Sequence, residues 1–252
     1  ISETEIELAK NKINLPPLIC PAGTIALTAG IDPGQGGFWY AALAWRRDLG
    51  PHLLQYGWLS GDYETSEIET MVSKWRYEVE GEERSLAFWR VGIDTGGSEY
   101  TEANLTMTAA AYEWIRKMRK PGLFGTKGLS KNIPKRLREA RIDKMPGDKG
   151  ALIPGGLVLI EINTTAVKNL IWFRLNRNIA ECPNCKASTR FRPAEITSNL
   201  PPTCKNCGSE LPKKEISGIF TFHSETGEEF FKHLLSDRVR RLTDGALERV
   251  RT

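Results

Sequence analysis

The stretch of sequence that decides the fold runs from Thr24 to Trp45 and reads TIALTAGIDPGQGGFWYAALAW. Its first apolar run leads to Asp32, a glycine-rich segment follows, and a second apolar and aromatic run extends from Phe38 to Trp45. Glycine-rich residues between two such runs predict a β-hairpin, because glycine adopts the backbone angles that tight turns need. The first strand of this hairpin is expected to end at the carboxylate of Asp32.

A second segment, from Phe88 to Gly97, repeats this ending and reads FWRVGIDTGG. Two strands that each end in Ile-Asp followed by glycines predict that Asp32 and Asp94 lie side by side. Two carboxylates at the ends of neighbouring strands suit a hard divalent cation such as magnesium. A single Ile-Asp-x-Gly is a weak signal, since an aspartate in a glycine turn often only accepts hydrogen bonds from backbone amides.

The length and composition favour one large globular domain with an insertion. The chain has 252 residues, of which 26% are charged and 40% hydrophobic, values that are ordinary for a globular protein. No apolar run reaches the length of a transmembrane helix, so no membrane association is expected. The N-terminal sequence ISETEIELAKNK is polar and acidic and does not have the character of a signal peptide. We interpret residues 1–22 as a linker from an upstream domain.

The positive charge of the chain is concentrated in one block. Between Arg116 and Lys149 there are twelve Lys and Arg residues and three acidic residues, a local net charge of +9. Since the whole chain carries +4, the remainder carries −5. A block of this kind indicates a polyanionic partner such as DNA, but Pro134, Pro146 and Gly147 are equally compatible with a solvated, flexible loop.

The hydrophobic periodicity predicts an α/β protein. Strands are expected at about 24–31, 38–46 and 52–60, followed by alternating helices and strands, which together favour a mixed sheet flanked by helices. The pair Ser66 and Glu69 has the spacing of a capping box, and the helix that it begins is expected to bury Trp75 and Val79 and to end at Gly81. A short strand over 122–126 is expected to lead into a loop with Lys127, and Asn163, Thr164 or Thr165 is expected to cap a later helix. A last helix is expected to bury the apolar residues between Phe230 and Val239.

Four of the five cysteines form two Cys-x-x-Cys pairs, Cys182–Cys185 and Cys204–Cys207, with eighteen residues between the pairs. This spacing predicts a four-cysteine zinc ribbon inserted at 180–212, with a closed tetrahedral site of the structural kind. Cys20 is left over, and an odd count with paired spacing favours metal over disulfides and a reducing compartment. The ribbon is expected either to stabilise a loop with little core or to contact DNA or protein through its basic residues. These are Lys186, Arg190, Arg192 and Lys205.

Three classes of function fit these features. Ribonuclease-H-like nucleases cluster acidic residues around two metal ions that activate water and stabilise the leaving oxygen. Actin-like ATPases and sugar kinases use glycines after an aspartate to hold phosphates, but that fold needs two large lobes, and the sequence contains no P-loop motif. The third class is a zinc-ribbon nucleic-acid-binding module without catalysis, in which the aspartates only cap turns.

Five segments together resemble the C-terminal nuclease domain of the large terminase subunit of lambda-like tailed phages. In chain order they are Thr28–Asp32, Ile93–Gly97, Lys127–Gly128, Leu159–Ile160 followed by a helix that contains Lys168, and Phe230–Asp237. The resemblance implies a ribonuclease-H-like nuclease domain over 23–179 and 213–252. It also implies an Mg²⁺- or Mn²⁺-dependent endonuclease that cuts concatemeric double-stranded DNA during packaging in the host cytoplasm. Its implied partners are an upstream packaging ATPase domain, the terminase small subunit and the portal of the procapsid.

By position, the resemblance makes Asp32 and Asp94 metal ligands, places Lys127 near the active site or the DNA, and matches Asp237 loosely to a further acidic residue. Such relatives end with an Asn-Glu-x-Leu-Asp segment that is not found here, so we expect that the chain is truncated or that Asp237 or Asp244 replaces its aspartate. The histidines show no ligand spacing and are expected to be structural or on the surface. The residues expected to contact DNA phosphates are Lys127, Lys131, Lys135, Arg136, Arg138 and Arg141.

Overall fold

The computed structural model of the chain describes residue 9, residues 11–96, 102–129, 133–146, 151–175, 179–191, 202–211 and 218–234, and the backbone of 237–241 and 247–251. Within 102–129, side chains are described from residue 107 onward. Lys131 and Arg192 therefore lie outside the described residues. The described helices are α2 (Ile68–Lys74), α3 (Glu102–Met118), α4 (Thr164–Leu175) and α7 (Glu228–Leu234). None of them is long and apolar enough to cross a membrane.

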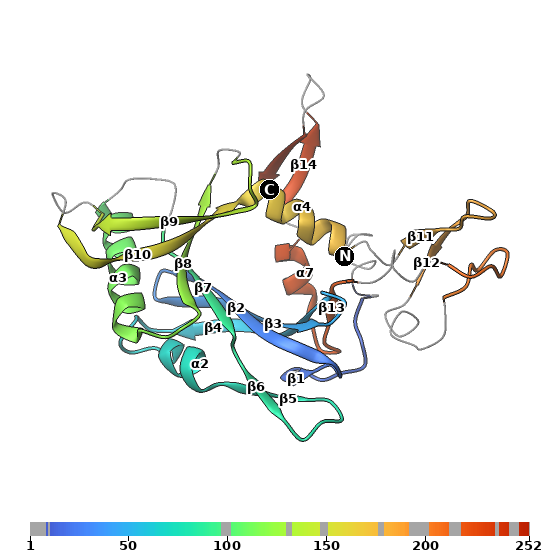
Figure 1. Cartoon of the computed structure of the whole chain (residues 1–252), viewed down its shortest axis with the longest axis horizontal. Helices are drawn as coiled ribbons and strands as arrows, with labels where there is room; N and C mark the ends of the chain where they lie inside the picture. The colour runs from blue at the N-terminus through green and yellow to red at the C-terminus, as the bar shows by residue number, and fades with distance from the viewer. Residues whose placement is uncertain are drawn as a thin grey trace. The chain divides into compact units, whose positions relative to one another are not determined.

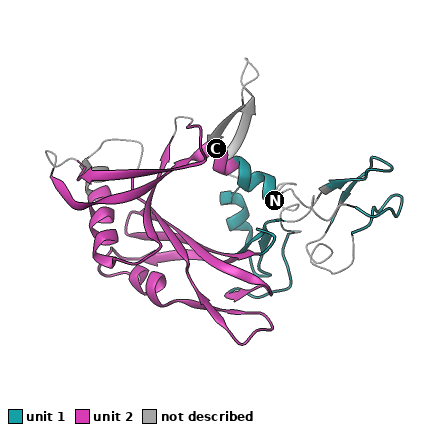
Figure 2. Ribbon diagram, viewed as in Figure 1, with its two compact units in different colours: residues 1–17, 47–52, 169–252 teal, residues 18–46, 53–168 magenta. Residues whose placement is uncertain are grey.

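The chain divides into two compact units (Figure 2), of which one contains residues 18–46 and 53–168 and the other residues 1–17, 47–52 and 169–252. We call them the sheet unit and the cysteine unit. The strands of the first half of the chain, labelled in Figure 1, are β1 (Ile19–Cys20), β2 (Thr24–Gly34), β3 (Gly37–Arg46), β4 (Pro51–Ser60), β5 (Arg76–Val79), β6 (Ser85–Ala87), β7 (Arg90–Asp94) and β8 (Leu123–Leu129). The later strands are β9 (Leu137–Lys144), β10 (Leu152–Asn163), β11 (Ile179–Glu181), β12 (Ser188–Arg190), β13 (Thr221–Phe222), β14 (Asp237–Arg241) and β15 (Leu247–Arg251).

The large sheet is mixed, as the sequence predicts, and its strand order is β13-β4-β3-β2-β7-β8-β10-β9. Strands β2 and β3 form the predicted antiparallel hairpin, with Gln35 and Gly36 between the paired residues Gly34 and Gly37. Gly36 has a φ of 80°, an angle that is readily adopted only by glycine. On the other side of β2, strands β7, β8 and β10 run parallel to their neighbours, and β9 closes the edge in the antiparallel direction.

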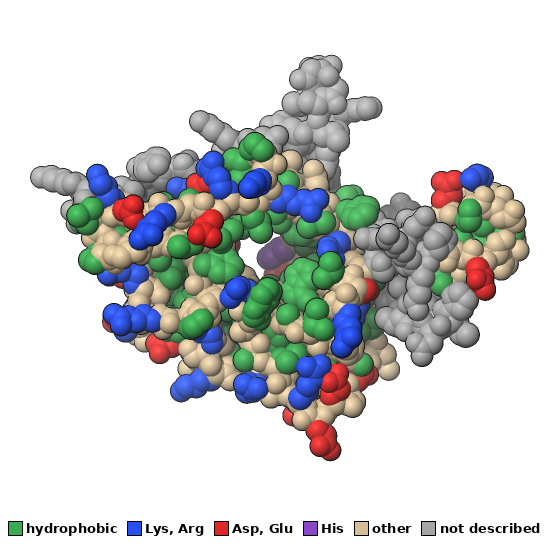
Figure 3. Space-filling view, viewed as in Figure 1, with side chains coloured by type: hydrophobic (Ala, Val, Ile, Leu, Met, Phe, Trp, Pro, Cys, Tyr) green, Lys and Arg blue, Asp and Glu red, His purple; other side chains and the backbone are tan. Residues whose placement is uncertain are grey.

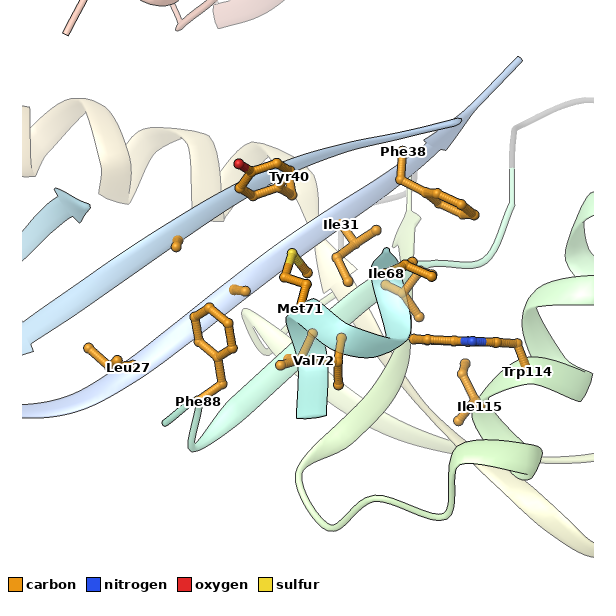
Figure 4. Close-up of a cluster of buried hydrophobic side chains, with 14 of the residues drawn as sticks. Leu27, Ile31, Phe38, Tyr40, Ile68, Met71, Val72, Phe88, Trp114 and Ile115 are labelled. Carbon is orange, nitrogen blue, oxygen red and sulfur yellow. The ribbon is translucent and has the colours of Figure 1, made fainter. Parts of the chain in front are cut away.

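One face of the large sheet packs against α2 and α3 in a shared hydrophobic core (Figure 4). The sheet contributes Ile31 and Ile93, α2 contributes Met71, and α3 contributes Trp114 and Ile115. Side chains alternate between the two faces of a strand. The residues that follow Ile31 and Ile93, namely Asp32 and Asp94, therefore belong to the opposite face. We call this opposite face the acidic face of the sheet.

The structure corrects three of the predicted elements. Helix α2 ends at Lys74, because the backbone becomes extended at Trp75 and the next residues form β5, which buries Val79. It begins after Glu67 without a side-chain cap, so the predicted capping box is not formed. Strand β8 continues to Leu129, which places Lys127 within a strand and not in a loop. Helix α7 ends at Leu234, so Val239 belongs to β14 and not to the last helix.

In the cysteine unit, the segment before the first strand is tied to β13. The Asn11 side chain donates hydrogen bonds to the carbonyl oxygens of Leu175 (2.9 Å) and Phe220 (3.2 Å), and the backbone N–H of Ile13 donates to Phe222 (2.9 Å). The described part of residues 1–22 is thus well packed, while its role as a linker from an upstream domain stays a prediction. Of the three candidate caps of α4, the structure selects Asn163, since its Oδ1 accepts a hydrogen bond of 3.0 Å from the N–H of Ala166.

Candidate active site and cysteine cluster

The sheet register brings Asp32 and Asp94 together. Strands β2 and β7 pair in parallel through Ile31 and Ile93, and each aspartate is the next residue along its strand. Adjacent strands lie about 4.8 Å apart, so the two carboxylates are neighbours at the same level of the acidic face. Asp32 is exposed and Asp94 is half-buried, which leaves the pair accessible from solvent.

The pKa of Asp94 reflects its proximity to Asp32. Burial raises the pKa of the Asp94 carboxyl above its ordinary value, and the negative charge of Asp32 raises it further. The backbone N–H of Gly96, with its nitrogen 3.4 Å from Oδ1, opposes this rise, and the positive charge of Lys127 opposes it to a smaller extent. A half-buried carboxylate and an exposed one that repel each other form a site that a divalent cation with oxygen ligands would stabilise.

Lys127 lies close to the acidic pair but is not in the same row of residues. Thr126 pairs with Asp94, and Lys127 is the next residue of β8, in register with Glu161 on β10. Glu161 is in turn paired with Arg138 on β9 and forms an ion pair with it. The carboxylate of Glu161 therefore lies between two basic residues, an arrangement that the sequence analysis missed because it depends on pairing between distant segments.

The basic block is largely a strand and not a loop. Of the described residues predicted to contact DNA, Lys135 and Arg136 directly precede β9, and Arg138 and Arg141 belong to it; all four are exposed. Arg141 lies 3.4 Å from Asp143 and donates a hydrogen bond of 3.1 Å to the carbonyl of Gly155. Basic and acidic side chains consequently alternate along the β9–β10 edge (Figure 3), and the charge there is partly neutralised within the sheet.

Among the described residues, no third acidic or histidine side chain joins Asp32 and Asp94 in a cluster of potential metal ligands. The side chain of Asp237, at the beginning of β14, lies outside the described residues. The histidines occupy structural or surface positions: His52 is buried with Nδ1 2.9 Å from Thr221 Oγ1, His223 is buried, and His233 is exposed.

The four paired cysteines converge in the cysteine unit. Their sulfur atoms all lie within 4.8 Å of one another, with 3.6 Å between Cys182 and Cys207 and 3.6 Å between Cys185 and Cys204. A tetrahedral zinc ion with Zn–S bonds of about 2.3 Å separates its sulfur ligands by roughly 3.8 Å. The cluster therefore has the size and the thiol chemistry that a metal ion such as zinc requires.

The two knuckles are built alike. In each, a backbone N–H four residues after the first cysteine donates a 2.9 Å hydrogen bond to that cysteine's carbonyl, from Lys186 in one and from Gly208 in the other. Both donors have positive φ, 59° for Lys186 and 75° for Gly208. Amide groups of Asn206 approach two of the sulfurs, with its backbone nitrogen 3.4 Å from Cys204 and its side-chain nitrogen 3.5 Å from Cys185. Donors of this kind stabilise thiolates, which are the form that binds metal.

The fold and the candidate sites define an α/β protein with a carboxylate pair on a mixed sheet and a separate four-cysteine cluster. The chain belongs to the family of the terminase large subunit gpA endonuclease domain, whose family model matches residues 2–250. This membership confirms the family identified from the sequence motifs and supports a nuclease role in DNA packaging. Searches of curated proteins and of solved structures give no match.

Proposed function

We propose that the chain is the Mg²⁺- or Mn²⁺-dependent endonuclease domain of a viral packaging terminase, and that it cuts concatemeric double-stranded DNA by two-metal-ion hydrolysis. The observation that carries the proposal is the juxtaposition of Asp32 and Asp94 on the accessible acidic face. The two negative charges repel each other there, and a bound cation would relieve this repulsion. The antiparallel meander β4-β3-β2, continued by parallel strands on the side of β2, supports a ribonuclease-H-like fold.

In this proposal, Asp32 and Asp94 hold the divalent ions, and Asp237, which the family resemblance matches only loosely, is a candidate for a further acidic residue of the site. When bound, two such ions activate a water molecule and stabilise the leaving oxygen of the phosphodiester. The carboxylates fix where the scissile phosphate lies relative to the sheet. We give Lys127 a supporting electrostatic role, because its positive charge already acts on Asp94, although Thr126 and not Lys127 is the register partner of Asp94.

For DNA binding, we propose that Lys127, Lys131, Lys135, Arg136, Arg138 and Arg141 contact phosphates. Lys135 and Arg136 are exposed at the sheet edge. Arg138 and Arg141 would first have to exchange Glu161 and Asp143 for phosphate, so we expect them to contribute less. The upstream ATPase domain, the small subunit, the portal and the host cytoplasm remain proposals that rest on the family.

We also propose that Cys182, Cys185, Cys204 and Cys207 hold a structural zinc ion. All four positions of a tetrahedron would be taken by sulfur, which leaves none open for water or substrate. The site therefore supports the fold of the region 180–212, whose described residues form a small core around Phe191 and Leu211 that Ile219, beyond the region, completes.

The decisive test replaces the more exposed carboxylate by its neutral isostere. Asp32→Asn should lose metal-dependent nicking of supercoiled plasmid while its far-ultraviolet circular dichroism and melting temperature stay close to wild type. Glu83→Gln removes one negative charge from an exposed turn of the same unit and should cut as the wild type does. An Asp32→Asn protein that still nicks plasmid with Mg²⁺ or Mn²⁺ would show that the nuclease assignment is wrong.

A further inference from the structure

The residue directly opposite Asp32 in the β2–β3 hairpin is Trp39. Directly paired residues of an antiparallel ladder project from the same face with their Cβ atoms about 5 Å apart, so the indole of Trp39 stands beside the carboxylate on the acidic face. Its side chain is 49% exposed, although tryptophan usually covers most of its apolar surface.

A second aromatic residue fixes the position of Trp39. The rings of Trp39 and Trp58, on β4, have centroids 5.1 Å apart and planes inclined at 59°. Trp58 itself occupies the space above the hairpin turn, because a Cβ atom at Gly34 would lie 3.2 Å from its ring and one at Gly37 only 2.5 Å. Because Gly34 and Gly37 carry no side chains, the turn leaves room for the ring of Trp58, which in turn packs against Trp39.

The sheet next to Trp39 and Asp32 carries almost no side chains. One step back on the same face, Ala41, Gly30 and Gly92 lie in register across β3, β2 and β7. Gly30 is exposed, and no atom lies within 4 Å of the position that a Cβ atom would take there. The acidic face is therefore open over Gly30, beside Asp32 and Trp39, whereas the side chains of Thr126 and Phe124 lie over Gly92.

We propose that Trp39 packs against the sugar and base of the nucleotide next to the scissile phosphate and so positions the strand that is cut. Two oxygen ligands of one octahedral magnesium ion lie roughly 3–4 Å apart, since each Mg–O distance is about 2.0–2.1 Å, so a phosphate bound through the ion would be close to the carboxylate. The indole of Trp39 projects from the same face as that carboxylate. An uncharged ring does not attract phosphate but stacks on bases of any sequence, so its contact is with the attached nucleoside.

The inference rests on the proposed function, and the test separates the two. Cut positions are first mapped on a defined duplex with the wild-type chain. 2-Aminopurine is then placed, one position at a time, at the nucleotides flanking the mapped break, and its fluorescence is measured with the Asp32→Asn protein, which binds without cutting. We expect the fluorescence to change at a nucleotide adjacent to the break. The change should be lost in Asp32→Asn/Trp39→Ala and largely kept in Asp32→Asn/Trp39→Phe.

Trp89 supplies the matched control. It is 61% exposed in the same unit, but it directly precedes β7, whose far end carries Asp94. In otherwise wild-type protein, Trp39→Ala should raise KM on the order of tenfold, the loss of one stacked base. Trp89→Ala should leave KM and the aminopurine signal unchanged. Equal kinetics and equal signals for Trp39→Ala and wild type would overturn the inference alone, whereas persistent cutting by Asp32→Asn would overturn the proposed function itself.

Discussion

At the residue scale, Asp94 and Asp62 are carboxylates whose environments act in opposite directions. Burial, with the nearby charge of Asp32, raises the pKa of Asp94. Hydrogen bonds from the side chain and backbone of Thr65 lower the pKa of Asp62, which is fully exposed in a turn. Since a pKa shift between folded and unfolded states is a contribution to stability, the two residues should respond oppositely to the same substitution.

We predict that Asp94→Asn does not lower the melting temperature at pH 7 and raises it where no metal is bound. The folded protein holds the Asp94 proton more tightly than the unfolded chain, so the ionised form costs stability at neutral pH. As the pH falls through the raised pKa toward the ordinary 3.8, wild type regains that stability and the difference between the two proteins should shrink. Thermal melts of both proteins in chelator from pH 7 to pH 3.5 provide the measurement.

Asp62→Asn is the control with the opposite sign. Its carboxylate is stabilised when ionised, so the variant should melt below wild type at neutral pH, and the deficit should begin to shrink as the pH falls through the ordinary pKa of 3.8 and should vanish only below the lowered pKa of the folded state. If Asp94→Asn showed the same profile as Asp62→Asn, burial and the charge of Asp32 would not dominate the environment of Asp94.

The two site carboxylates were predictable from the sequence because each follows an apolar strand, and the parallel register then places them at one level. Trp39 was missed as a site residue, although the signal was present. A two-residue turn at Gln35 and Gly36 makes Asp32 and Trp39 direct partners, and this turn length was not used to assign the pairing. Glu161 was not predictable, because its neighbours Lys127 and Arg138 reach it only through the pairing of separate strands.

At the scale of elements, the cysteine knuckles make a prediction about metal content. Elemental analysis should find about one zinc ion per chain, because four thiolates complete a tetrahedral site. Cys182→Ser/Cys185→Ser should abolish it and unfold the region 180–212, whose folding depends on the metal. The sheet unit should persist, as judged by protection of its core amides from hydrogen exchange.

Cys20→Ala is the matched control for the zinc prediction. Cys20 is buried in the core of the sheet unit and does not belong to the cluster, and burial raises the pKa of its thiol to about 12. It should therefore be inert toward metal, and its replacement should leave the zinc content unchanged. A protein with no zinc and with a disulfide between the knuckles would contradict the zinc assignment.

Strand β9 leads to a prediction about the salt dependence of DNA binding. Each phosphate contact contributes about 0.9 to the slope of log K against log salt concentration, so Lys135→Gln/Arg136→Gln should reduce that slope by roughly 2 for any DNA sequence. Arg138→Gln/Arg141→Gln should reduce it less, because both residues already have acidic partners. Fluorescence anisotropy titrations at several salt concentrations give the slopes.

Lys117→Gln/Lys120→Gln removes the same charge from the end of α3 and the turn that follows it, and should change the slope little. Equal losses from all three double variants would show that net charge, and not β9, governs binding.

The errors at this scale have a common cause. Trp75 and Val79 are four residues apart, which fits one face of a helix, but Tyr77 and Val79 also alternate as in a strand, and burial in the core selected the strand. Val239 likewise fits both a helical spacing with the preceding apolar residues and a position in a strand. Local spacing cannot decide between the two periods when the apolar run is short.

At the scale of the whole molecule, the number of acidic ligands determines how well metal is held. Asp32 and Asp94 supply two negative charges, whereas two divalent ions bring four positive charges, and the phosphate of the substrate neutralises only part of the difference. We therefore predict weak Mg²⁺ binding in the absence of DNA and better cutting in Mn²⁺, which tolerates imperfect coordination. Isothermal titration and plasmid cutting in each metal test this. Tight binding of two Mg²⁺ ions to the DNA-free chain would contradict it.

The identity of the third ligand is tested by comparing Asp237→Asn with Asp244→Asn. If the resemblance assigns the position correctly, only the first variant should lose cutting and metal affinity, and the second should match wild type. The reverse result would transfer the role to Asp244. If neither variant lost cutting or metal affinity, the third ligand would have to be a residue other than Asp237 and Asp244.

The hairpin turn beside the acidic face also restricts how this family can vary during evolution. A methyl group at Gly37 would lie 2.3 Å from the backbone oxygen of Leu59, a clash that no exchange of side chains elsewhere relieves. At Gly34 the obstacle is only the ring of Trp58, at 3.2 Å. Homologous sequences should therefore keep glycine at the position of Gly37 without exception. At the position of Gly34 they should admit larger residues only in lineages where a small residue replaces Trp58, so that positions 34 and 58 change together.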